Sequence, residues 1–162
     1  MRSHKFFSYC EADTIALGKA IGSLMRQGDL VTLIGPMGAG KTRIAKGIVS
    51  AATGIDENDV ISPSFSLINR YDGRITVDHA DLYRLNPDQA LELGVYEALD
   101  DGAVVMEWGE HKDKLGDSEL QIVITYTEDE NSRLLELSHA ENGSWGERIE
   151  QALGSIRLIS GR

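Results

Sequence analysis

The sequence predicts an α/β fold with a central sheet that mixes parallel and antiparallel strands. The β-branched run Leu30–Ile34 is typical of a buried strand, and it leads directly into GPMGAGKT, Gly35–Thr42. Apolar residues at helical spacing follow, so a strand, a loop and a helix succeed one another. Two β-rich runs, 66–71 and 74–78, flank the hairpin signal Asp72-Gly73. Together these features predict a three-layer fold of the phosphate-loop (P-loop) nucleotide-hydrolase type.

The segment before the loop strand is expected to form one helix. Asp13 is a candidate N-cap, the apolar spacing continues to about Arg26, and Gly28 is a stop signal. A second helix begins after the glycine-rich stretch and is expected to end near Gly54. The polar segment around Pro63 then predicts a loop that lies beside the glycine-rich stretch.

The rest of the chain is expected to complete the sheet and to add two helices. These elements are a short helix at 86–93, a buried strand at 103–106, strands at 121–127 and 134–137 around a polar turn, and a helix at 146–153. Glu107 follows the buried strand directly, so an acid is expected at that strand's carboxyl end. The tail after Gly154 is expected to fray.

The stretch Gly35–Thr42 fits the phosphate-loop pattern of a glycine, four residues and Gly-Lys-Thr. Glycines let backbone N–H groups surround a phosphate, Lys41 supplies a mobile positive charge, and the Thr42 hydroxyl is a ligand for Mg²⁺. The positive end of the following helix adds to this attraction. The residues expected to bind nucleotide here are Gly35, Gly38, Ala39, Gly40, Lys41, Thr42 and Arg43.

Length and composition restrict the class of nucleotide protein. The 162 residues predict one domain, 1–162, and the single cysteine, Cys10, excludes an internal disulfide. No apolar run approaches the ~20 residues of a membrane span, so a cytoplasmic protein without membrane contact is expected. The net charge is −10 although the first 50 residues are net basic. This balance argues against direct nucleic-acid binding, so any role with RNA is expected to be indirect.

Two acids compete for the metal-supporting role opposite Thr42. Phosphoryl chemistry at a phosphate loop needs an acid at the end of a neighbouring strand and a group that orients the nucleophile. Glu107 follows the apolar run, and Asp81 ends the run ITVDHAD. Each is also compatible with an ordinary cap or turn acid, and the sequence does not divide the two roles between them.

Four further motifs follow the phosphate loop in order. They are SPSFSL (62–67), HADLYRL (79–85), ELG (92–94) and MEWGE (106–110). With the loop, they resemble the TsaE family, formerly called YjeE, over about residues 6–140. Members of that family are small bacterial ATPases that act with TsaB and TsaD in the biosynthesis of threonylcarbamoyladenosine in tRNA. The resemblance therefore implies Mg²⁺-dependent ATP hydrolysis of low intrinsic rate that depends on the TsaB–TsaD complex, with ATP or residual ADP as the bound nucleotide.

The resemblance also implies roles for individual residues. Thr42 and Glu107 would form the Mg²⁺ pair, and the implied catalytic residues are Lys41, Asp81, Glu107 and Trp108. Ser62, Pro63 and Ser64 match a mobile, switch-like segment that ends at Ser66, while Thr14 and Arg133 match residues that border the nucleotide. Three of these positions have ordinary structural alternatives: core packing for Trp108, a helix start for Thr14 and a surface ion pair for Arg133.

The sequence departs from the family pattern at two positions. Ser64 stands where the family usually has threonine after Ser-Pro, which keeps the hydroxyl and removes a methyl group. Arg43 stands where a second threonine is common after Lys-Thr, and its effect on turnover is an open question.

Two other function classes remain as alternatives. A small-molecule kinase would share the loop and the size, but such enzymes usually carry an arginine-rich lid, and arginines are sparse between Arg84 and Arg133. A GTP-operated switch would need an Asn/Thr-Lys-x-Asp segment to read guanine, and the nearest stretch, 111–114, does not fit.

Overall fold

The computed structural model describes residues 1–64 and 66–160. They form β1 (Arg2–Ser8), α1 (Glu11–Ser23), β2 (Leu30–Ile34), α2 (Lys41–Thr53), β3 (Ile68–Tyr71), β4 (Val77–Asp81), α3 (Pro87–Glu92), β5 (Ala103–Glu107), β6 (Glu119–Tyr126), β7 (Arg133–His139) and α4 (Gly146–Ser160). Two single turns of 3-10 helix, η1 (Glu57–Asp59) and η2 (Glu97–Asp100), complete the regular structure of this part of the chain.

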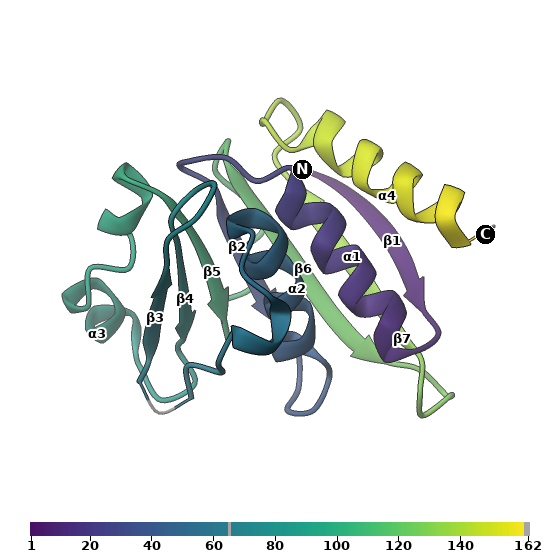
Figure 1. Ribbon diagram of the computed structural model, residues 1–162, viewed down its shortest axis with the longest axis horizontal. Coiled ribbons are helices and arrows are strands. Elements are labelled where there is room, and N and C mark those ends of the chain that lie inside the picture. The colour runs from purple at the N-terminus through teal and green to yellow at the C-terminus, as the bar shows by residue number, and fades with distance from the viewer. Residues whose placement is uncertain (65, 161–162) are drawn as a thin grey trace.

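Seven strands of the described residues join one sheet in the order β1-β7-β6-β2-β5-β4-β3 (Figure 1). The loop strand β2 is central and runs parallel to β6 and β5, and β4 runs parallel to β5. β3 pairs antiparallel with β4, and β7 pairs antiparallel with β6 and β1. The predicted mixed sheet is therefore confirmed. Because β2, β5 and β4 are parallel, their carboxyl ends meet at one edge of the sheet, where ligands of such sheets bind.

Alternating strand residues build a core on each face of the sheet. On one face, Val31 and Val105 contribute to a core that α1, α2 and α4 cover. On the other face, Val104 packs with Val95 and Leu99 from the segment after α3. These two cores confirm the expected three layers. The phosphate loop connects the central strand to α2, so the core holds both ends of the loop.

The β3–β4 hairpin differs from its predicted form. Tyr71 pairs with Val77, so the connection spans 72–76 and is longer than a two-residue turn. Gly73 lies so close to the end of α2 that a Cβ atom would collide with the Thr53 carbonyl, which accepts a hydrogen bond from the Arg74 N–H at 3.0 Å. Contact with α2 shapes this connection, and a local turn signal does not report such a contact.

The ends of several elements also differ from the prediction. The edge strand β1 was not predicted, because its partner β7 lies more than 120 residues later. Helix α1 begins at Glu11 and ends at Ser23, and Asp13 acts from inside the first turn by accepting a hydrogen bond from the Tyr9 N–H at 3.0 Å. Helix α4 continues to Ser160, so the fraying predicted after Gly154 is wrong over these residues. Residues 161–162 lie outside the described part of the chain.

Over residues 1–64 and 66–160, no helix has both the length and the apolar character that crossing a bilayer would require.

A pair of histidines joins β1 to β7. The His4 and His139 rings stack with their centroids 5.4 Å apart, and their Nε2 atoms lie 3.2 Å apart.

Burial lowers the pKa of His4 below its ordinary 6.5, and charge on His139 lowers it further. The unfolded chain therefore binds a proton at His4 more readily than the folded chain does. The free energy of unfolding should fall as pH drops below about 6.5 towards the folded-state pKa. Urea denaturation across this range should show the fall, and His4→Gln should flatten it; an identical profile for the variant would contradict the assignment.

Candidate functional site

The phosphate loop leaves β2 at Ile34 and enters α2 at Lys41. Gly38 and Gly40 have φ values of 79° and 113°, which L-residues with side chains rarely adopt. Gly40 is also the N-cap of α2, so the unpaired N–H groups of the first helical turn lie at the end of the loop. The local structure is therefore the anion-binding arrangement that the motif predicts.

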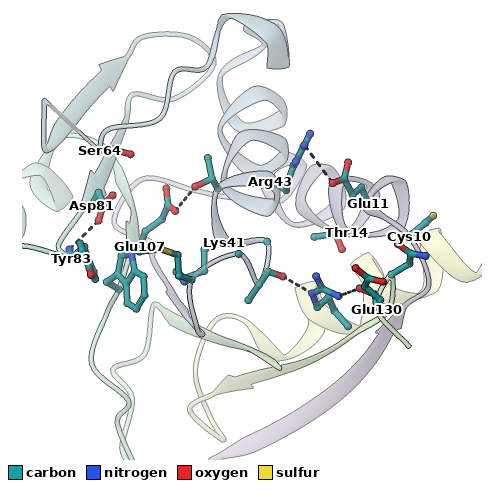
Figure 2. A pocket seen from close by; sticks show the side chains of 18 of the residues that line it. Cys10, Glu11, Thr14, Lys41, Arg43, Ser64, Asp81, Tyr83, Glu107 and Glu130 are labelled. Carbon is teal, nitrogen blue, oxygen red and sulfur yellow. Dashed lines mark hydrogen bonds and ion pairs between the residues drawn. The ribbon is translucent and has the colours of Figure 1, made fainter. Parts of the chain in front are cut away.

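A cavity of about 970 Å³ opens over this loop. Figure 2 shows Asp81, Tyr83 and Glu107 towards one end, Lys41 between, and Cys10, Glu11 and Glu130 towards the other end. Among the residues singled out from the sequence, those that line the cavity are Thr14, Gly38, Ala39, Gly40, Lys41, Thr42, Arg43, Ser64, Asp81, Glu107, Trp108 and Arg133. Residues far apart in the chain thus converge on one cavity.

The Lys41 ammonium lies at the centre of the cavity against the loop backbone. Its Nζ donates hydrogen bonds to the carbonyl oxygens of Gly35 at 2.6 Å and Pro36 at 2.8 Å. Gly35 itself does not line the cavity and contributes through this carbonyl. Burial lowers the pKa of Lys41 below its ordinary value, whereas the carboxylates of Glu107 and Asp81 act to raise it. Lys41 is therefore a charge near two acids, and its hydrogen bonds go to the loop carbonyls.

Thr42 and Glu107 meet across the cavity edge. The Thr42 hydroxyl donates to Oε1 of Glu107 at 2.8 Å, although the two residues are 65 positions apart. Glu107 is 2% exposed, and its Oε2 lies 2.6 Å from Nε2 of the buried His79. The acid that faces the loop threonine in this structure is therefore Glu107.

Asp81 occupies the equivalent position on the adjacent strand. The parallel register of β4 and β5 places it directly beside Glu107. Its Oδ1 accepts a hydrogen bond from the Tyr83 N–H at 2.9 Å, and its side chain lines the cavity. Two carboxylates thus stand side by side at the carboxyl ends of neighbouring strands, each with different partners.

Trp108 turns the chain at the end of β5 and forms one wall of the cavity. Its φ is 61°, and its N–H donates to the Leu33 carbonyl at 3.0 Å. The Lys41 Nζ lies 3.7 Å from the centroid of the indole, and the Tyr83 ring lies 4.8 Å from it. The indole therefore packs against the lysine and the cavity, not in the core of the sheet.

The β6–β7 hairpin supports the loop from the other side. Arg133 Nε donates to the Ala39 carbonyl at 3.1 Å, and its guanidinium lies 4.5 Å above the Tyr126 ring. The Tyr126 hydroxyl donates to the Met37 carbonyl at 2.8 Å. The surface ion pair considered for Arg133 is not what the structure shows, because its guanidinium contacts backbone carbonyls and an aromatic ring. These contacts hold the apex of the loop in place.

The remaining predicted residues have simpler surroundings. Thr14 is buried, and its hydroxyl lies 2.6 Å from that of Ser8. Arg43 forms an exposed ion pair with Glu11 at 3.4 Å. The hydroxyls of Ser62 and Ser64 lie 2.6 Å apart, and of the triplet 62–64 only Ser64 lines the cavity. Phe65 of the switch-like segment lies outside the described residues, and the switch role stays a prediction.

Several residues that sequence reasoning did not single out line the site or support it, and His79, Arg84 and Tyr126 are examples. His79 and Arg84 flank the acid of the HADLYRL motif, and Arg84 lines the cavity. Their membership in that motif was the signal that could have found them. Tyr126 carried no comparable signal, because its contact with Met37 spans 89 positions.

The oxygen atoms at the Thr42–Glu107 pair fit Mg²⁺. No cluster of three or more His, Cys, Asp or Glu side chains forms a metal cage within 1–64 and 66–160. Mg²⁺ bound with a nucleotide does not need such a cage, because phosphates and waters supply most of its ligands. A hydroxyl and a carboxylate oxygen 2.8 Å apart at the cavity edge are the hard donors that it prefers.

A family model described as "Threonylcarbamoyl adenosine biosynthesis protein TsaE" matches residues 9–135. The chain belongs to the TsaE family. This family takes part in the biosynthesis of threonylcarbamoyladenosine in tRNA. The match includes the phosphate loop, both acids and Trp108, so the motifs that suggested TsaE from the sequence lie inside it.

Individual relatives agree with this membership. The tRNA threonylcarbamoyladenosine biosynthesis protein TsaE of Nostoc sp. is 35% identical over 140 residues, which cover 83% of this chain and 85% of that protein. TsaE of Rickettsia conorii is 34% identical over 144 residues, with 86% and 82% covered. The crystal structure of Bacillus subtilis YdiB matches with a TM-score of 0.70 and 27% identity, covering 98% of this chain and 97% of that one. The fold predicted from the sequence is therefore shared with a solved structure over nearly its whole length.

Proposed function

We propose that this TsaE-family chain binds ATP with Mg²⁺ and hydrolyses it in support of the tRNA modification that the family serves, acting with the TsaB–TsaD complex. The observation that carries the proposal is the Thr42–Glu107 hydrogen bond beside Lys41 at the mouth of the phosphate loop. It combines a loop for phosphates, a cation and a hard oxygen pair in one cavity. Contact with tRNA is assigned to the partners, since this chain is strongly acidic overall.

The chemistry is divided among the residues of the cavity. Mg²⁺, when bound, neutralises phosphate charge and polarises the reacting phosphoryl group. Thr42 and Glu107 would hold the ion, and Lys41 would exchange its hydrogen bonds with the loop carbonyls for contacts with the phosphates. Asp81 orients the attacking water beside Glu107. Trp108 forms the wall that keeps Lys41 and the reacting phosphate apart from bulk water.

We infer an orientation of the nucleotide from the two ends of the cavity. Asp81 and Glu107 lie towards one end, so we assign the terminal phosphate to that end. The end that Cys10, Glu11 and Glu130 line is then left for the nucleoside. ADP that remains after turnover would occupy the same cavity, and the end of the cavity lined by Asp81 and Glu107 would then hold no terminal phosphate.

The proposed dependence on partners is supported by the cations that line the cavity. Arg133 is engaged by the loop carbonyl of Ala39, and Arg43 pairs with Glu11. Arg84, on the turn after β4, is exposed at the rim. With these contacts we expect a low intrinsic rate, and we propose that TsaB–TsaD raises it by ordering the segment around Ser64 or by adding a positive charge.

A reconstitution experiment tests the proposal. ATP hydrolysis and modified adenosine in tRNA should both require this chain, TsaB, TsaD and Mg²⁺, and Lys41→Ala should lose ATP binding and both activities. Products from small phosphate acceptors would favour a kinase, and displacement of ATP by GTP at equal concentration would favour a GTP-operated switch. If omission of the chain changes neither hydrolysis nor modification, the proposed function is wrong.

A further inference from the structure

His79 is completely buried directly behind the candidate metal acid. It belongs to β4 and is 0% exposed, and its side chain lies on the same face of the strand as Val77 and Asp81. Its Nε2 lies 2.6 Å from Oε2 of Glu107, on the neighbouring strand β5. The other carboxylate oxygen, Oε1, accepts the hydrogen bond of Thr42. One carboxylate is thus held from two sides, by a strand behind it and by the loop helix in front.

The hydrogen bonds define the form of the imidazole. An ionised carboxylate only accepts hydrogen bonds, so Nε2 of His79 carries a proton and donates the hydrogen bond. Nδ1 has no hydrogen-bond partner among the described residues. A proton on Nδ1 would be a buried donor without an acceptor, which is costly. The geometry therefore fits a ring that donates a hydrogen bond from Nε2 to the carboxylate.

The carboxylate of Glu107 could adopt more than one orientation. A glutamate side chain has three torsions, and the single hydrogen bond from Thr42 does not fix the plane of its carboxylate. Lys41 and Glu107 line the same cavity, so the ammonium attracts the carboxylate; burial lowers the pKa of Lys41, and the charge of Glu107 opposes that effect. The acid Asp81 stands beside it in register and repels it. Without a second hydrogen bond, the Glu107 carboxylate would turn towards Lys41 and form an ion pair with it. Lys41 would then be less able to bind the phosphates.

We propose that His79 is a positioning residue that keeps Glu107 turned towards Thr42 and away from Lys41. This inference rests on the proposed function, because its consequence is for Mg²⁺ and nucleotide. The hydrogen bond from Nε2–H of His79 fixes the plane of the Glu107 carboxylate. It thereby keeps Oε1 beside the Thr42 hydroxyl as a preformed oxygen pair. It also leaves the Lys41 ammonium able to bind phosphate. Partners of metal ligands that act in this way typically change metal affinity or activity by about 10–100-fold when they are lost.

Two variants separate the hydrogen bond from the packing. His79→Gln keeps an N–H donor near the position of Nε2, whereas His79→Leu fills similar space without a donor. ATP affinity should be measured by calorimetry in excess Mg²⁺ and in EDTA, together with kcat and KM for hydrolysis in the presence of TsaB and TsaD. His79→Leu should lose about tenfold of the affinity that Mg²⁺ adds, and about tenfold or more in kcat. His79→Gln should stay within about threefold of the unmodified chain on both counts.

The outcomes distinguish the two proposals. Equal losses in the Leu and Gln variants, or equal Mg²⁺-dependent affinity in the Leu variant and the unmodified chain, would overturn the role of His79 alone. An unmodified chain whose ATP binding ignores Mg²⁺ would overturn the proposed function and this inference with it.

If neither variant folds, nitrogen NMR of the histidine rings in the unmodified chain decides the matter. The inference requires a hydrogen-bonded proton on Nε2. A ring that carries its proton on Nδ1 and none on Nε2 would contradict it.

Discussion

Glu107→Gln is expected to lower Mg²⁺-dependent ATP hydrolysis by about 100-fold or more while leaving ATP binding in EDTA nearly unchanged. Glutamine preserves the volume of the side chain, and its carbonyl still accepts a hydrogen bond. It removes the negative charge that, in the proposed function, would make Glu107 a hard ligand for Mg²⁺ beside Thr42. Because the phosphate loop and Lys41 are untouched, the loss should appear in kcat and in the Mg²⁺ dependence, not in metal-free affinity.

Glu110→Gln is the matched control for this experiment. Glu110 belongs to the same MEWGE motif but is exposed and lies outside the cavity lining. The same loss of one charge at this position should leave kcat within about twofold, since surface charges far from a reacting centre are screened by solvent. Retained Mg²⁺-dependent hydrolysis in Glu107→Gln would refute Glu107 as the metal acid and direct attention to Asp81.

The second large effect concerns stability. Arg148→Met is expected to lower the free energy of unfolding by about 3–5 kcal/mol. Arg148 forms a bidentate pair with Asp29 at 2.6 Å and 3.0 Å, and its Nη1 also donates to the Leu24 carbonyl at 2.9 Å. The side chains of Arg148 and Asp29 are only 5% and 2% exposed. Methionine keeps much of the aliphatic volume but leaves the Asp29 carboxylate buried without its counter-charge.

Urea denaturation measures this effect as a lower midpoint with an unchanged slope. Arg157→Met provides the control, because Arg157 is an exposed arginine on the same helix. The double variant Asp29→Leu with Arg148→Met should regain part of the loss, since it removes the uncompensated charge. A loss below about 1 kcal/mol in Arg148→Met would show that the pair contributes no more than a surface ion pair. ATP affinity should not change, because neither residue lines the cavity.

Much of the fold could be predicted because its signals are local. The strand Leu30–Ile34 was predicted with the bounds that the structure has, and the turn glycines and the helix after them followed from the same motif. The prediction was less accurate where distant contacts decide. The strand β1 depends on pairing with β7, and the connection 72–76 follows its contact with the end of α2.

The sequence by itself determined the phosphate loop and its flanking strand and helix, because the glycines, the lysine and the threonine lie in one short segment whose signal is local. It also determined the family, because four further motifs follow the loop in order. Only the tertiary structure decided which acid faces Thr42. That choice depends on the parallel pairing of β2 with β5, which brings Glu107 to the loop across 65 positions and leaves Asp81 beside it. The support from His79 and Tyr126 likewise arises from contacts between strands, and no spacing in the chain encodes such contacts.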